Sequence, residues 1–341
     1  MSNIIPSMVA VIDHFLSDEE AIQFRLNNKI YVIGEACTRH KLDWRRELSA
    51  FPDSQEWQGL FFGAIHISGL ENVNIVSGCP ANKLSSFKNL APKSGDKFVL
   101  EYPRFETDKN YNIQEIVGLE QKTIKINNIE IVPESAGHGI RYATLSGRDI
   151  HVVSLGFGTT EIAQVVNGKV VSKTVASINK GARIAAETFR ELLDSEGVTG
   201  DHANLSQLYY WDNLLRAAHD KKNELWLTFN TGERKSIFEM NKLSIIATKS
   251  YASALCPELS THFRNVIDNH PIVLCGGSTF FTESTNFIKE NLESLSFPVK
   301  IAPEEHRKTS AAKGYKYLCD RVFKDNCIGI DIGNNNTVLE V

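Results

Sequence analysis

The sequence predicts an α/β fold that combines β-hairpins with crossover helices. From Ile272 to Asp331, apolar strand-like runs alternate with amphipathic helical runs, and such alternation is typical of layered α/β proteins. Two hairpins are also predicted earlier, at 22–33 and 161–174, where alternating strands are joined by Asn27-Asn28 and Asn167-Gly168. These are among the preferred residues of two-residue β-turns.

The first part of the chain is predicted to be mainly antiparallel β structure. Strand-like runs cover 4–13, 22–26, 29–33, 73–80, 98–100, 121–126 and 129–132. Apolar residues at helical spacing predict a first helix over 55–69. A second helical pattern covers 134–145, although Gly137 and Gly139 weaken it.

The second part is predicted to be richer in helices. Strands are expected at 150–155, 161–166, 169–174, 272–275, 299–302 and 327–331, and helices at 181–193, 236–267, 280–292 and 308–323; the run 225–229 is the exception within an otherwise irregular segment. Pro257 is expected to break the long helix, because proline removes a backbone donor. The polar segment 198–234 predicts a small inserted subdomain.

Composition narrows the function. Of the 341 residues, 42% are hydrophobic and 23% are charged, as in ordinary soluble globular proteins, and the formal net charge is -4. This charge gives no reason to expect direct nucleic-acid binding. The six cysteines show no metal-binding spacing, and no signal sequence or apolar run of membrane-spanning length is present. We therefore expect a cytoplasmic protein with no membrane partner.

Three loops of small, hydrogen-bonding residues follow predicted strands. They are Asp331–Thr337, Ser154–Thr160 and Gly276–Thr279. The first two lie between the strands of a hairpin, unlike a Walker loop or a dinucleotide fingerprint, whose glycines open a helix. Backbone amides in such turns can surround a phosphate. Each loop by itself is equally consistent with an ordinary polar turn.

Together, the loops resemble those of the actin, sugar-kinase and heat-shock chaperone superfamily. The resemblance is to plasmid-segregation actin-like ATPases of the ParM (StbA) type, and it is carried by 132–137, 155–160, 273–277 and, less specifically, 312–315. It implies an actin-like (ribonuclease H-like) α/β fold with two domains and a nucleotide cleft between them. Domain I would comprise 1–145 completed by 308–341, and domain II would comprise 146–307.

The sequence departs from the family pattern in two ways. The Asp-x-Gly hairpin normally opens the chain, whereas here Asp331 lies near its end. We therefore expect a circular permutation, whether natural or engineered. The family also has an aspartate at the head of its second phosphate hairpin, where this chain has Ser154. A serine brings no charge, so metal affinity or turnover should be weaker unless another acid substitutes.

The resemblance implies a role for each matching residue. Glu134 would position the attacking water, and Asp331 would hold hydrated Mg²⁺; the alternative for Glu134 is a glutamate favoured by a helix N-terminus. The remaining nucleotide contacts would be Gly333, Asn334, Asn335, Asn336, Thr337, Ser154, Gly156, Gly158, Thr159, Thr160, Gly181, Gly276, Gly277 and Ser278. Plain turns or close packing are the alternatives for these residues.

The expected function is that of a filament-forming bacterial actin. It would bind ATP (or GTP) with Mg²⁺, assemble head to tail with itself, and segregate plasmid DNA through a DNA-binding adaptor protein. Hydrolysis would control filament stability. One alternative is a nucleotide-binding scaffold with little or no hydrolysis. A small-molecule kinase on the same fold is a weaker alternative, because no further acidic motif suggests a base for a substrate hydroxyl.

Overall fold

The computed structural model describes residues 2–44, 51–108, 113–198, 208–220, 225–333 and 336–341. The chain forms two compact units. Unit 1 comprises Met1–Arg141 with Lys308–Val341, and unit 2 comprises Tyr142–Arg307.

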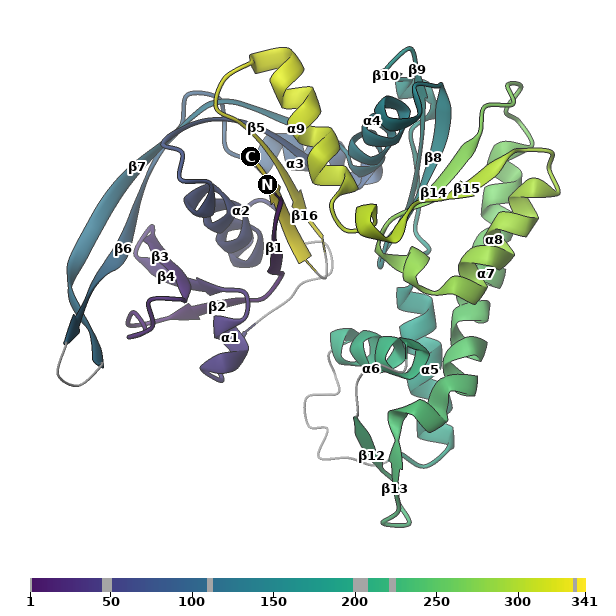
Figure 1. Ribbon diagram of the computed structural model, residues 1–341, viewed down its shortest axis with the longest axis horizontal. Helices are drawn as coiled ribbons and strands as arrows, with labels where there is room; N and C mark the ends of the chain where they lie inside the picture. Colours follow the sequence, from purple (N-terminus) through teal and green to yellow (C-terminus); the bar gives the residue numbers. More distant parts are fainter. Residues whose placement is uncertain (1, 45–50, 109–112, 199–207, 221–224, 334–335) are drawn as a thin grey trace. The chain divides into compact units, whose positions relative to one another are not determined.

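Unit 1 is built on a nine-stranded sheet whose spatial order is β1-β17-β16-β5-β7-β6-β3-β4-β2. Its strands are β1 (Ser2–Pro6), β2 (Val9–Ile12), β3 (Ile22–Leu26), β4 (Lys29–Ile33), β5 (Asn72–Cys79), β6 (Lys97–Asp108), β7 (Ile113–Pro133), β16 (Cys327–Ile332) and β17 (Asn336–Glu340). The first and last strands are antiparallel neighbours, with Ser2 opposite Glu340, so the chain ends lie together (Figure 1).

Helices cover both faces of this sheet. They are α1 (Ala36–Arg39), α2 (Gln55–Ser68), α3 (Leu84–Leu90), α9 (Ser310–Phe323) and α4 (Glu134–Ser146), whose last residues belong to unit 2. Helix α2 confirms the first predicted helix and shares a core with Ile75 and Ile330. Helix α9 packs with Val76 through Tyr315. Because neighbouring strand residues point to opposite faces, Gly329 meets α9 while Ile330 faces α2.

Helix α9 lies against the backbones of both α4 and β16. A Cβ atom on Gly314 would lie 1.8 Å from the carbonyl oxygen of Gly137, and one on Gly329 would lie 2.2 Å from the carbonyl oxygen of Ala312. Only glycine permits this approach. The predicted helix over 134–145 is confirmed, and Gly137, which weakened that prediction, is the residue that α9 crosses.

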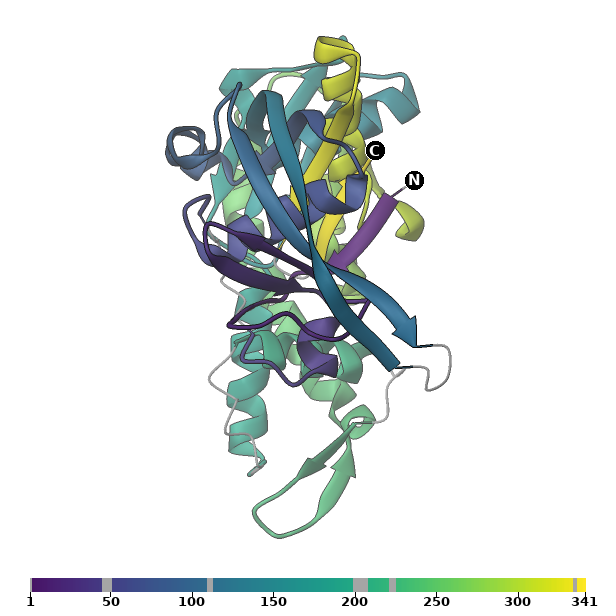
Figure 2. The same cartoon turned by 90° about the vertical axis from the view of Figure 1, so that its left-hand side faces the viewer.

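The hairpin of β6 and β7 is much longer than the sequence predicted. The predicted strands 121–126 and 129–132 belong to one 21-residue strand, β7, which pairs with the 12-residue β6 along its length (Figure 2). The hairpin touches β3 at one register position, Arg25 opposite Glu101, where an ion pair of 2.9 Å forms. Its outer part lacks the apolar alternation that reveals a strand.

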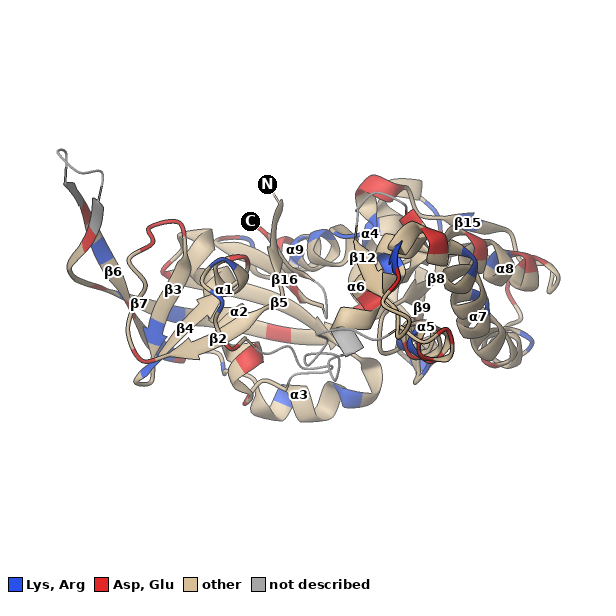
Figure 3. Cartoon of the chain, turned by 90° about the horizontal axis from the view of Figure 1, so that it is seen from below, with Lys and Arg blue, Asp and Glu red and all other residues tan. Residues whose placement is uncertain are grey.

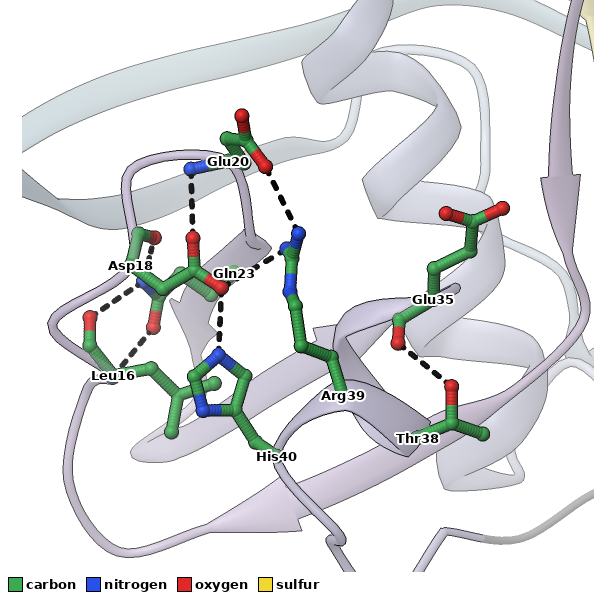
Figure 4. Close-up of polar contacts among 8 residues, drawn as sticks. All are labelled: Leu16, Asp18, Glu20, Gln23, Glu35, Thr38, Arg39 and His40. Atoms are coloured by element: carbon green, nitrogen blue, oxygen red, sulfur yellow. Dashed lines mark hydrogen bonds and ion pairs between the residues drawn. The ribbon is translucent and has the colours of Figure 1, made fainter.

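A polar network fixes the loop between β2 and β3 to α1 (Figure 4). The Asp18 carboxylate accepts hydrogen bonds from the Glu20 amide (3.0 Å) and pairs with His40 (2.6 Å) and Arg39 (2.9 Å). Burial acts to raise the pKa of Asp18, but these partners outweigh it and lower the pKa below its ordinary value. The buried Gln23 side chain bonds both backbone groups of Leu16.

Unit 2 contains a six-stranded sheet in the order β10-β9-β8-β14-β15, with β11 also paired to β9. Its elements are β8 (Ile150–Leu155), β9 (Thr160–Val166), β10 (Lys169–Val170), β11 (Ala176–Ile178), α5 (Arg183–Ser195), α6 (Leu208–Asp220), β12 (Trp226–Thr228), β13 (Arg234–Ser236), α7 (Asn241–Phe263), β14 (Ile272–Cys275), α8 (Thr282–Glu293) and β15 (Val299–Ile301). The helices α5, α7 and α8 contribute Phe189, Leu255 and Ile288 to one core.

Besides the β6–β7 hairpin, other predicted elements also differ from the structure. The run 4–13 is two strands separated by Ser7 and Met8, and the run 169–174 is the short β10 followed by a 3₁₀ turn. Helix α7 continues through Pro257, because its buried neighbours hold it in the core. The polar segment 198–234 includes α6, whose Trp211 and neighbours enter the core of unit 2; its residues 199–207 and 221–224 lie outside the described part.

Neither the charged residues nor the helices of the described chain stand out. Acidic and basic residues are interspersed along both units (Figure 3). Among the described residues, no helix has the length and apolar character needed to cross a membrane.

The contact of α9 with α4 predicts that Gly314→Ala destabilises the protein. The added methyl group meets a main-chain oxygen, so we expect a loss of about 1–3 kcal/mol in the free energy of unfolding, despite the better helix propensity of alanine. Gly118→Ala is the control, because a Cβ there has no neighbour within 4 Å. Denaturant titration measures both. Equal effects of the two substitutions would contradict the crossing.

Candidate functional site

In unit 1, the hairpin of β16 and β17 ends in a tight turn. Ile332 is opposite Thr337 in the strand pairing, and the Gly333 amide donates to the carbonyl oxygen of Asn336 at 3.1 Å. Gly333, Asn336 and Thr337 are thus brought together with Asp331, as the hairpin prediction requires. The predicted contacts Asn334 and Asn335 lie outside the described residues.

Ser7 braces this turn, a role that the sequence did not reveal. Its hydroxyl donates to the carbonyl oxygen of Gly333 at 2.7 Å and lies 3.1 Å from the hydroxyl of Thr337. Thr337 is fully buried, and the Ser7 hydroxyl is a partner for its side chain within the protein. The only signal for Ser7 in the sequence is a small polar residue between two apolar runs, which is too common to be diagnostic.

Asp331 and Glu134 form the electrostatic centre of unit 1. Asp331 lies at the end of β16, and Glu134 begins α4, where the Tyr315 hydroxyl donates to its backbone carbonyl at 3.3 Å. Burial raises the pKa of Asp331, and the charge of Glu134 raises it further; burial also raises the pKa of Glu134. The two carboxylates therefore repel each other when both are ionised.

This pair fits a hydrated divalent cation. Carboxylate oxygens are the ligands that Mg²⁺ prefers, and Mg²⁺ commonly keeps several waters while using one or two carboxylates. A cation beside Asp331 would offset the repulsion that raises its pKa. His138 does not belong to this donor set, because its ring bonds the Ser310 hydroxyl at 2.7 Å and burial lowers its pKa to about 4.

In unit 2, the hairpin of β8 and β9 encloses the second small-residue loop. Leu155 is opposite Thr160, and the Gly156 amide donates to the carbonyl oxygen of Thr159 at 3.0 Å. Within the described chain, the amides of Phe157 and Gly158 donate to no protein acceptor. The loop can therefore offer amides to an anion. The Thr160 hydroxyl is already used, because it donates to the carbonyl oxygen of Lys180 at 2.7 Å.

Gly181 lies beside this loop and packs closely against it. A Cβ atom there would lie 2.3 Å from the carbonyl oxygen of Phe157. The next two amides, of Ala182 and Arg183, donate to the carbonyl oxygens of Gly156 and Phe157. The start of α5 therefore supports the loop and does not present these two amides to a ligand.

The third predicted loop also contacts the second hairpin. Gly276 has a positive φ of 90°, and a Cβ atom on it would lie 2.7 Å from the carbonyl oxygen of Leu155. The buried Ser278 hydroxyl donates to the carbonyl oxygen of Gly156 at 2.9 Å, so its side chain braces the loop. Gly277 has open space around it.

Arg216 contacts this third loop, because its guanidinium group donates to the carbonyl oxygen of Gly277 at 3.5 Å. Its guanidinium group is 5.0 Å from the ring centre of Phe281, and it also pairs with Asp212 at 2.9 Å. Arg216 belongs to α6, a helix that the sequence did not predict, so nothing in the sequence connected it with this loop.

The raised pKa of Asp331 predicts a pH-dependent gain in stability for Asp331→Asn. A raised pKa means that the folded protein must ionise this group at a cost as the pH rises through that pKa, whereas the unfolded chain ionises it freely. The substitution should therefore raise the free energy of unfolding at about pH 9, by about 1.4 kcal/mol for each unit of pKa elevation removed, and change it little at about pH 4.

Thermal and denaturant unfolding across this pH range measure the effect without any ligand. Asp320→Asn is the matched control in the same unit, because Asp320 is an exposed acid paired with Lys316. A gain that is equal at both ends of the range, or no gain, would contradict the electrostatic assignment.

Comparison with known proteins supports the fold. Residues 1–137 match a family model described as "Actin like proteins N terminal domain". Comparison with the curated proteins gave no match.

Several solved structures resemble nearly the whole chain. An archaeal actin homolog, Ta0583, solved with ADP, has 15% sequence identity and a TM-score of 0.64, with 93% of this chain and 92% of that chain covered. ParM from Bacillus thuringiensis with ATP has 13% identity and a TM-score of 0.52 over 91% and 89%. The apo psk41 ParM protein has 16% identity and a TM-score of 0.51 over 93% and 90%.

These identities are low, and the likeness concerns the fold. It extends over nearly all of this chain and of each relative. The chain has the mixed α/β fold of the actin-like proteins.

Proposed function

We propose that this chain is a nucleotide-dependent, filament-forming bacterial actin that segregates plasmid DNA through an adaptor protein. The observation that carries the proposal is the pair of glycine-containing hairpin turns on an actin-like fold, one of them beside Asp331 and Glu134. Structures of similar proteins with ADP and ATP support nucleotide as the ligand.

In this proposal, unit 1 supplies the charged groups. Asp331 would hold a hydrated metal ion through its waters, and Glu134 would accept a hydrogen bond from the attacking water. Burial raises the pKa of Glu134 toward neutrality, which suits a group that accepts and releases a proton. Bound Mg²⁺ would neutralise charge on the phosphates. Phosphoryl transfer depends mainly on such positioning and electrostatics.

Unit 2 supplies backbone contacts to the nucleotide. The amides of Phe157 and Gly158 donate to phosphate oxygens, and the turn at Gly276 and Gly277 receives the adenosine. The hydroxyls of Thr160 and Ser278 hold the two loops in shape, because each donates to a backbone carbonyl. On this basis Gly277, with open space around it, is the residue at which a flat ring can approach the backbone.

Filament formation follows from head-to-tail contacts between copies, which do not close on themselves. The net charge of -4 gives no reason to expect that the chain binds DNA directly. A separate DNA-bound adaptor would make that connection, and ATP hydrolysis would set the lifetime of the filament.

Sedimentation and light scattering with ATP and Mg²⁺, with ADP, and without nucleotide test the proposal. We expect ATP to move the protein into the pellet, and phosphate release to follow assembly. A protein that binds ATP yet stays monomeric at high concentration would contradict the filament.

An alternative function is a nucleotide-binding filament or scaffold with little hydrolysis. Ser154 favours it, because an uncharged residue stands where the family resemblance implies an aspartate. Assembly with ATP without phosphate release in the same experiment would identify this alternative.

We also propose that the chain is circularly permuted relative to other actin-like proteins. The Asp331 hairpin follows all the other motifs, and β1 pairs directly with β17. The strands β16, β17 and β1 thus form one antiparallel series, broken only where the two ends of the chain meet.

A rearranged variant tests the permutation. It begins at Lys324 and joins Glu340 to Ser2 by an Asn-Gly turn, which is suited to a hairpin. We expect it to keep the circular dichroism spectrum and cooperative unfolding, because Ser2 and Glu340 already face each other. The control opens the chain inside β5, in the middle of the sheet, and should not fold. Failure of the first variant would contradict the proposal.

A further inference from the structure

Ser154 has an unusual environment for a serine in a sheet. It is 1% exposed, and its hydroxyl has no hydrogen-bond partner in the described part of the chain. A buried polar group without a partner costs free energy, and such groups in native proteins are commonly satisfied by a water or an ion. The position is one residue pair from the turn of the second hairpin.

The residue opposite Ser154 is an acid. Glu161 on β9 pairs with Ser154 on β8, and Ser177 on β11 pairs with Glu161. Directly opposed residues on neighbouring antiparallel strands point to the same face, with Cβ atoms about 4.5–5.5 Å apart. The three side chains therefore form a row across three strands, with the carboxylate in its centre.

The Ser177 hydroxyl helps to hold Glu161 in place. Glu161 is 1% exposed, and its carboxylate accepts a hydrogen bond from the Ser177 hydroxyl. A buried carboxylate is costly to maintain unless it is compensated, and its field is felt more strongly than that of an exposed one, because less water screens it. Ser154 is the residue opposite Glu161 on β8, the strand that lies on the other side of β9 from Ser177.

We propose that Glu161 supplies, from β9, the negative charge that this hairpin lacks on β8. The Ser154 hydroxyl contacts a water of the hydrated divalent cation that accompanies the nucleotide, and Glu161 acts through Ser154 as a positioning residue. The acidic residue of this hairpin thus lies on β9 in this chain, opposite the position on β8 where the family resemblance implies an aspartate. This inference rests on the proposed function, because it concerns the same nucleotide.

The test compares ATP affinity in Mg²⁺ with ATP affinity in EDTA, measured by calorimetry for each variant. Glu161→Gln keeps an acceptor for Ser177 but removes the charge, and we expect it to lower the Mg²⁺ enhancement by about 10-fold or more, as is typical of outer-shell groups. Its affinity in EDTA should change little. Glu293→Gln is the control, because it removes a charge from the surface of α8 in the same unit.

Exchange of the two residues gives the sharpest result. Ser154→Asp combined with Glu161→Gln returns the acid to β8, and we expect it to restore the Mg²⁺ enhancement. A purely structural Glu161 would instead give Glu161→Gln a lower Tm with an unchanged enhancement, which would overturn the inference, as would failure of the exchanged variant to recover it.

Two further outcomes are informative. If Glu161→Gln does not fold, Ser154→Ala decides, because it leaves the carboxylate intact and should still lower the Mg²⁺ enhancement severalfold; an unchanged enhancement contradicts the inference. A wild-type protein that binds no ATP in either condition contradicts the proposed function itself. Wild-type binding with an unaltered enhancement in every variant contradicts only the role of Glu161.

Discussion

Three backbones meet where α9 crosses unit 1, and the position of the charged groups depends on this contact. Gly314 lies against Gly137 of α4, and Gly329 of β16 lies against the backbone of α9. Tyr315, the next residue of α9, donates to the carbonyl of Glu134. Since backbone packed on backbone leaves little freedom, α9 fixes the start of α4 relative to the end of β16. Glu134 and Asp331 are thereby held close enough to interact.

That closeness has a cost in the protein without ligand. Two carboxylates whose pKa values are both raised by burial resist ionisation together, so unit 1 contains a repulsion that contributes nothing to folding. Sites that are destabilised in this way are common where a ligand completes the arrangement. A bound cation would convert the same two charges from a cost into an attraction, which links stability directly to occupancy.

Much of the fold could be predicted from local patterns. The hairpin at 22–33 was predicted with its strand limits because Asn27 and Asn28 tolerate the left-handed conformation, and both adopt it, with φ of 50° and 63°. Patterns failed where long-range contacts decide. Helix α6 was not predicted from its sequence, but Trp211 packs it into the core of unit 2. Helix α7 continues through Pro257 because the burial of its neighbouring side chains outweighs the loss of one backbone hydrogen bond.

The residues of the candidate site also differ in whether a local pattern could predict them. The hairpin loops could be found from their small residues, whereas Ser7 and Glu161 could not, because their significance depends on which strand lies beside them. A local sequence pattern does not predict strand register when both strands are fully buried, because their sequences lack the alternation of apolar and polar residues. From the sequence, Ser154 is only a position where the family resemblance implies an acid. The acid opposite it, Glu161, is recognised only from the pairing of β8 with β9.

The order of strands in unit 1 also bears on how the protein folds. β16 and β17 are the last strands of the described chain, yet they lie between β1 and β5, so β1 has no partner in the sheet until they arrive. Contacts between residues so distant in sequence form slowly. Unit 2 is one continuous segment, so its sheet can form from neighbouring parts of the chain, whereas the sheet of unit 1 closes only when strands from two distant segments, on either side of unit 2 in the sequence, come together.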